Sequence, residues 1–155
     1  MVVDALFGNA NIEGHDINIL IDTGSVGSIV TKRFLQAINK DIDGPTTTKI
    51  IDVMGRQSAP LGMVKQLKIN INGIIIPEDA IVTEALGYNV LLENSWLNKA
   101  NAVIDYKLNQ LTAEYKGQVT TIPITCAERI DPRFFTQIYN ENNELELEEE
   151  EDVNF

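Results

Sequence analysis

Residues 19–28 read Ile-Leu-Ile-Asp-Thr-Gly-Ser-Val-Gly-Ser, an order of residues that calls for a chemical explanation. Three apolar, β-prone residues lead directly into Asp22. Gly24 permits backbone angles that a Cβ would penalise and allows a close approach of the chain. The hydroxyls of Thr23 and Ser25 can hold a tight turn, and that of Ser25 can donate to the Asp22 carboxylate. The pattern predicts a buried strand that aims one partly desolvated carboxylate into a turn.

The same residues also fit a helix-capping turn, because an Asp or Ser ahead of a helix satisfies free backbone amides. A cap, however, requires neither an apolar strand before Asp22 nor Gly24 and Ser28 after it. We therefore favour a chemical role for Asp22.

The segments around this motif are mostly β-prone. Residues 5–12 and 17–21 flank a polar turn, which predicts a β-hairpin. Residues 28–38 place apolar side chains at helical spacing, so we expect a short helix there. Residues 49–53 and 61–71 are expected to form one long hairpin with an exposed tip, and residues 74–83 another strand.

A second strand, polar turn and helix follow. Residues 89–92 are typical of a buried strand, and residues 96–100 of a short helix capped by Asn94 or Ser95. We expect Trp96 to anchor this helix in the core. Residues 103–106, 111–115 and 119–124 then predict a three-stranded meander, so the fold class expected from the whole chain is all-β.

The composition bounds the domain organisation. The chain has 155 residues, of which 44% are hydrophobic and 23% charged, enough for one packed domain. We assign this domain to residues 1–126, leave residues 127–140 as an undecided extension, and expect residues 141–155 to be a disordered acidic tail or linker. That tail carries eight of the 23 acidic residues and no base, so the other 140 residues hold 15 acidic and 12 basic side chains, a net charge of −3. Nucleic-acid binding therefore lacks an electrostatic source.

Other classes of site and location are also disfavoured. Cys126 is the only cysteine, which excludes an intrachain disulfide and a thiolate-rich zinc site and fits a reducing, cytoplasmic location. The chain starts without a signal-like segment and has no long apolar run, so we expect neither secretion nor a membrane partner. His15 is the only histidine and lies in an expected exposed turn, which argues against a Ser/His/Asp triad. No residue pattern requires a metal or an organic cofactor.

The segment Asp22-Thr23-Gly24-Ser25, with three apolar residues before it and Ser28 and an apolar pair after it, resembles the active-site signature of aspartic proteases. Pepsin-like enzymes carry this signature twice in a longer chain, whereas it occurs once here. The resemblance therefore points to the retropepsin-like branch, in which two identical chains each supply one aspartate. More narrowly, the chain is similar to the protease segment of gypsy-type retrotransposon polyproteins.

The resemblance covers roughly residues 5–125. Val53, Met54, Gly55 and Arg56 are placed like the tip of the flap hairpin that closes over substrate in that family. Residues 91–97 resemble the family's apolar pair and the short helix after it, but Glu93 stands where the family has glycine. If that position needs a positive φ, we expect glutamate to cost about 1 to 2 kcal/mol or to force a different turn.

The resemblance implies a closed acid-protease barrel with a flap hairpin and one or two short helices. It also implies a homodimeric aspartic endopeptidase in which two Asp22 carboxylates share a proton and activate a water, with Thr23, Gly24, Ser25 and Ser28 supporting the loop. The implied substrate is a peptide or a retrotransposon polyprotein. The alternative is an inactive module of the same fold that dimerises or binds peptides, which Glu93 favours and the intact Asp22 signature disfavours.

Overall fold

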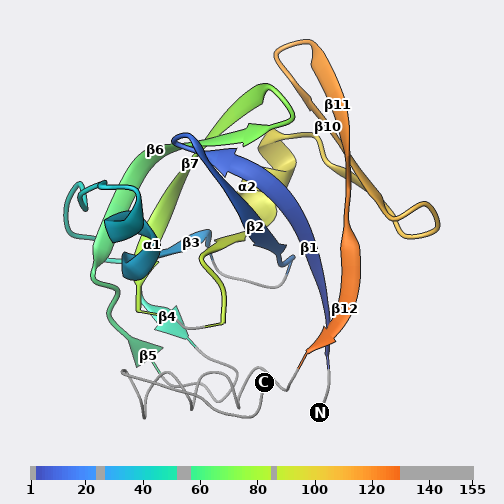
Figure 1. The fold of residues 1–155 in the computed structure, drawn as a ribbon. Helices are drawn as coiled ribbons and strands as arrows, with labels where there is room; N and C mark the ends of the chain where they lie inside the picture. The colour runs from blue at the N-terminus through green and yellow to red at the C-terminus, as the bar shows by residue number, and fades with distance from the viewer. Residues whose placement is uncertain (1–2, 24–26, 52–56, 85–86, 130–155) are drawn as a thin grey trace.

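The computed structural model describes residues 3–23, 27–51, 57–84 and 87–129 (Figure 1). In chain order the elements are β1 (Val3–Ile12), β2 (His15–Ile21), β3 (Ile29–Thr31), α1 (Lys32–Ala37), β4 (Ile50–Ile51), β5 (Gln57–Ser58), β6 (Gly62–Ile71), β7 (Ile74–Thr83), β8 (Val90–Leu92), α2 (Asn94–Lys99), β9 (Val103–Asp105), β10 (Gln110–Tyr115), β11 (Gln118–Pro123) and β12 (Thr125–Arg129).

The largest sheet closes into a barrel. Its strand order is β12-β1-β2-β8-β3-β7-β6, and β1 also pairs with β6 at Asn11–Asn70 and Ile12–Ile69. This additional pairing between β1 and β6 closes the ring, so six strands form the closed barrel and β12 is added outside β1. The expected all-β closed barrel with few short helices is confirmed.

The expected hairpin at the start of the chain is confirmed, but residues 28–38 are only partly helical. Residues 29–31 form β3, which pairs with β7 and β8, and α1 begins after them. β-branched side chains favour a strand here, and all three are buried between neighbours. Thr31 ends the strand and caps the helix, because its hydroxyl accepts the Phe34 N–H at 3.2 Å.

The expected long hairpin of residues 49–71 is wrong in its pairing. β4 pairs with β5, whereas β6 pairs along its length with β7. The reason lies in the turn between β6 and β7, where Asn72 and Gly73 have φ of 50° and 98°. An Asn-Gly pair with positive φ at both residues is the preferred two-residue hairpin turn, so β6 finds its partner locally. The expected flap tip, Val53 to Arg56, lies outside the described residues.

The three-stranded meander is confirmed as β9, β10 and β11, which form a separate sheet in the order β11-β10-β9 (Figure 1). Leu111, Ala113 and Ile122 from this sheet are buried in the main core. The next strand, β12, runs antiparallel to β1 and continues past residue 126 to Arg129.

In the part of the chain that the structure describes, no helix is long and apolar enough to cross a membrane.

Gly62, at the start of β6, lies against the connector that follows α1. Its φ is +152°, and a Cβ added there would lie 2.5 Å from Ile42 Cγ2 and 2.6 Å from the Gly44 carbonyl oxygen. Backbone cannot move aside as a flexible side chain can, so we expect Gly62→Ala to lower the free energy of unfolding by about 1 to 3 kcal/mol. Urea denaturation measures this change.

Gly44→Ala is the matched control for that experiment. It alters the other partner of the same contact, but a Cβ at Gly44 would have nothing within 4 Å. We expect its unfolding midpoint to stay near that of the unaltered chain. Equal losses in the two variants would show that the close approach at Gly62 is unimportant.

Candidate active site

Asp22 lies directly after β2, a barrel strand that pairs with β1 on one side and β8 on the other. β2 and β8 run parallel with Ile21 opposite Leu92, and the Asp22 N–H donates to the Leu92 carbonyl at 3.0 Å. The residue is half-buried. The predicted buried strand leading into a carboxylate is therefore present, and its carboxyl end is fixed to a neighbouring strand by a backbone hydrogen bond.

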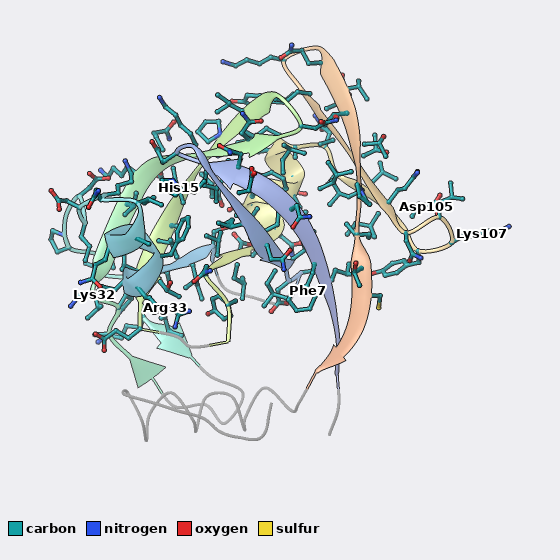
Figure 2. The ribbon with its side chains drawn as sticks, in the orientation of Figure 1. Phe7, His15, Lys32, Arg33, Asp105 and Lys107 are labelled. Carbon is teal, nitrogen blue, oxygen red and sulfur yellow. The ribbon has the colours of Figure 1, made fainter. Side chains whose placement is uncertain are left out.

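The face of the sheet that Asp22 shares is apolar. Side chains alternate along β2, so Asp22 lies on the same face as Leu20. Leu20 belongs to a small buried cluster that is separate from the main core, together with Ile29, Ile81 and Leu91. Phe7 of β1, which Figure 2 labels, and Ile50 of β4 pack against this cluster. The strand that ends at Asp22 thus carries, on this face, part of a buried apolar cluster against which Ile50 of β4 packs.

The segment after Asp22 is tied to α2. The Asn94 side-chain amide donates to the Thr23 carbonyl oxygen at 2.9 Å. Thr23 itself is exposed. Gly24 and Ser25, the other predicted supports of this loop, lie outside the described residues. Of the predicted loop residues, the structure therefore places Asp22, Thr23 and Ser28.

Ser28 closes the loop and is buried. Its hydroxyl donates to Glu78 Oε2 at 2.8 Å and accepts the Glu93 N–H at 3.3 Å. The same Glu78 carboxylate accepts from the Ser95 hydroxyl and from the Lys99 ammonium, the latter at 3.0 Å. Strand β7, the loop and α2 are thereby joined through one buried carboxylate.

Sequence reasoning missed Glu78, although a signal was present. Along β7 the residues at 74, 76, 78 and 80 are all buried, in keeping with the two-residue period of a strand. Glu78 therefore occupies an inward position in an otherwise apolar row. A charged residue at such a position indicates a buried polar contact, but its partner Ser28 is 50 residues away in sequence.

Glu93 has a backbone that glutamate adopts without strain. Its φ is −118° and its ψ is −166°, in the extended region, and its side chain is buried. The expected cost of a positive φ at this position therefore does not arise.

The expected cap of the second helix is wrong. Glu93, not Asn94 or Ser95, is the N-cap, and α2 begins at Asn94 without a side-chain cap hydrogen bond. The physical reason is that the Asn94 and Ser95 side chains bond to Thr23 and Glu78 instead. Trp96 is fully buried, as predicted, and its indole N–H donates to the Ile76 carbonyl at 3.2 Å.

His15 is far from this arrangement. It is exposed at the β1–β2 turn, the opposite end of β2 from Asp22 (Figure 2). Its ring Nδ1 lies 3.1 Å from the Glu13 carbonyl oxygen. Within the described ranges, no group of three or more His, Cys, Asp or Glu side chains is arranged to hold a metal ion.

The fold of the barrel is similar to that of three solved structures. The retroviral protease-like domain of Ddi1 from Leishmania major is 20% identical, with a TM-score of 0.62 over 79% of this chain and 92% of that one. The EIAV protease in complex with an inhibitor is 19% identical, with a TM-score of 0.54 over 64% and 90% of the two chains. A retropepsin-like aspartic protease from Rickettsia conorii is 16% identical, with a TM-score of 0.50 over 82% and 96%.

The family comparison rests on sequence and includes the Asp22 motif. None of the curated proteins compared with the chain matches it. The model of the family described as "gag-polyprotein putative aspartyl protease" matches residues 8–99, more than half of the chain, from β1 to the end of α2. The match spans Asp22, Ser28, Glu78 and Glu93. The chain therefore belongs to this gag-polyprotein aspartyl protease family, and its barrel is retropepsin-like.

Proposed function

We propose that this chain is an aspartic endopeptidase that works as a homodimer and hydrolyses peptide bonds in a polyprotein of the retrotransposon type. The observation that carries the proposal is the position of Asp22, fixed after a central strand by its N–H bond to Leu92 and flanked by a loop that α2 holds. Family membership supports the general kind of enzyme. The polyprotein substrate is suggested by the description of that family.

The homodimer follows from the chemistry. The signature occurs once in the chain, so one protomer brings one signature aspartate. General acid–base hydrolysis of a peptide needs one group to accept a proton from water and another to donate one. Two Asp22 carboxylates meeting at a two-fold axis would share a single proton and supply both groups.

The reaction then needs no covalent enzyme intermediate. The ionised Asp22 takes a proton from a water held between the two carboxylates, and the water oxygen attacks the scissile carbonyl carbon. The protonated Asp22 donates its proton to the carbonyl oxygen, which gives a tetrahedral gem-diol. Collapse of the gem-diol breaks the C–N bond as the amine nitrogen takes up a proton and one hydroxyl gives up its own.

Substrate is expected to bind as an extended strand over the apolar surface beside Asp22. Backbone hydrogen bonds of an added strand give affinity, and pockets for alternate side chains give preference. Leu20, Leu91 and Ile81 form a buried apolar cluster on this side of the sheet, and Ile50 of β4 packs against it. We propose that the segment around β4 and β5, with Val53, Met54, Gly55 and Arg56 between the two strands, closes over the peptide and excludes water.

Cleavage of a peptide library at about pH 4 to 7, with and without a statine-type inhibitor, tests this function. We expect cleavage of extended peptides with apolar residues at the scissile bond, and loss of cleavage when the inhibitor is present. A dimer without turnover would contradict the proposed enzymatic activity and support the alternative, an inactive module that binds peptides.

The variant Glu93→Gly further distinguishes an active enzyme from an inactive module. Because the backbone at Glu93 is extended, glycine is not required there for its φ, and we expect the variant to retain turnover close to that of the unaltered chain. A large gain in rate on this replacement would show instead that the glutamate side chain is what suppresses hydrolysis.

A further inference from the structure

Glu78 is the most deeply buried charged residue among the described residues, at 3% exposed. It stands in β7 between Ile76 and Ala80, both of which are buried in the main core. Burying a carboxylate costs free energy unless it is paired and hydrogen-bonded, and a well-packed apolar side chain often serves stability as well. The presence of a carboxylate at this position therefore calls for a role that an apolar residue cannot fill.

The Glu78 carboxylate is fully engaged. Oε2 accepts hydrogen bonds from the Ser28 hydroxyl, at 2.8 Å, and from the Ser95 hydroxyl. Oε1 accepts from the Lys99 ammonium at 3.0 Å, which balances the buried negative charge. Hydrogen bonds to an ionised acceptor are shorter and stronger than those between neutral groups, so this carboxylate fixes three side chains at once.

The groups that donate to Glu78 come from the end of the Asp22 loop and from α2. Ser28 ends the loop, and it also accepts the Glu93 N–H at the start of α2. Ser95 and Lys99 are four residues apart on α2 and therefore lie on one face of that helix. The same helix holds the beginning of the loop through the bond from Asn94 to Thr23. Both ends of the loop are thus tied to α2 and its N-cap, the first through Asn94 and the second through the Glu93 N–H and through Glu78.

We propose that Glu78 is a positioning residue for catalysis: through Ser28, Ser95 and Lys99 it holds the Asp22 loop in the geometry that the reaction needs. The inference rests on the proposed function. Its physical basis is that hydrogen bonds are directional whereas apolar contacts are not, and that an error of about 1 Å in a reacting group costs about a hundredfold in rate.

Glu78→Gln tests the proposal with the least change in shape. The amide keeps one acceptor oxygen but loses the charge, so it cannot accept from all three donors. We expect kcat to fall about tenfold or more while KM for a peptide stays within about twofold, because the loop is displaced but the apolar surface is kept. Glu13→Gln is the matched control, since Glu13 also pairs with a lysine, Lys40, at 3.8 Å, but far more exposed. It should leave both constants unchanged.

Ser28 provides a rescue experiment. Ser28→Ala removes the hydroxyl that connects the loop to Glu78, and we expect the same pattern of lost kcat and retained KM. Ser28→Thr keeps a hydroxyl and should recover most of the lost rate. The double variant Glu78→Gln with Ser28→Ala should lose less than the two single losses combined, because both changes break the bond between Ser28 and Glu78.

Hydrogen exchange gives a readout that does not depend on turnover. The Asp22 N–H is bonded to Leu92 inside the tethered region, so we expect it to exchange faster in Glu78→Gln than in Glu13→Gln. The amides of the β10–β11 hairpin, which contains none of these residues, should be unaffected. If the unaltered chain hydrolyses no peptide while this exchange pattern appears, the proposed function fails but the loop-holding role of Glu78 stands.

Two results would overturn the proposal. One is a Glu78→Gln variant with unchanged kcat and unchanged exchange at Asp22. The other is faster exchange throughout the β10–β11 hairpin as well, which would mean that Glu78 stabilises the domain in general and does not act on the loop in particular.

Discussion

Asp22→Asn is expected to abolish peptide hydrolysis, with kcat lowered by about a thousandfold or more. Asparagine has nearly the shape of aspartate, so the backbone bond to Leu92 and the strand before it should survive. The amide, however, can neither accept a proton from water nor share one with a second carboxylate. Steady-state rates on a cleavable peptide measure the loss, and circular dichroism and sedimentation check that fold and assembly are kept.

Asp16→Asn is the matched control, because Asp16 lies at the other end of the same strand and is exposed. It accepts a hydrogen bond from the Asn11 side chain at 2.9 Å, which an asparagine can also accept. Turnover in this variant should equal that of the unaltered chain. Retained hydrolysis in Asp22→Asn would assign the chemistry to some other group.

Trp96→Ala is expected to cause the largest loss of stability, about 3 to 5 kcal/mol in the free energy of unfolding. The indole is fully buried between α2 and the barrel, so its removal leaves a cavity under the helix that holds the Asp22 loop. The Ile76 carbonyl would also lose the indole N–H that it accepts. Domains of this size are stable by about 5 to 15 kcal/mol, so the loss is a large share of the total.

Urea denaturation followed by far-ultraviolet circular dichroism measures this loss. Trp96→Phe keeps most of the buried ring but not the N–H donor, and should cost less, about 1 to 3 kcal/mol. Tyr106→Ala, which removes a side chain that is 65% exposed, should change stability by no more than about 0.5 kcal/mol. Similar losses at Trp96 and Tyr106 would contradict the role of the indole as an anchor.

The features that the sequence predicts correctly are local ones. The hairpin of β1 and β2, the buried strand into Asp22, the core position of Trp96 and the final meander each depend on residues within one short segment. Periodicity and turn residues report on such segments directly. The sequence of residues 28–38 does not distinguish a strand from a helix, because a fully buried strand such as β3 lacks the alternation of apolar and polar residues that marks a strand.

The features that the sequence does not reveal are set by contacts between distant segments. β6 pairs with β7 and not with β4, because the Asn72-Gly73 turn brings β7 alongside β6. The bond between Ser28 and Glu78 joins residues 50 positions apart. Asn94 and Ser95 do not cap the helix for the same reason. Their local preference to cap is weaker than the hydrogen bonds that Thr23 and Glu78 offer in the folded barrel.

Mixing the unaltered chain with the Asp22→Asn chain, at constant total concentration and after subunit exchange, tests the central claim most directly. If each active site needs one Asp22 from each of two protomers, activity must follow the square of the unaltered fraction, so an equal mixture retains about one quarter of the full rate. A rate that falls in direct proportion to the unaltered fraction, to about one half in the same mixture, would show that a single protomer suffices and would contradict the account.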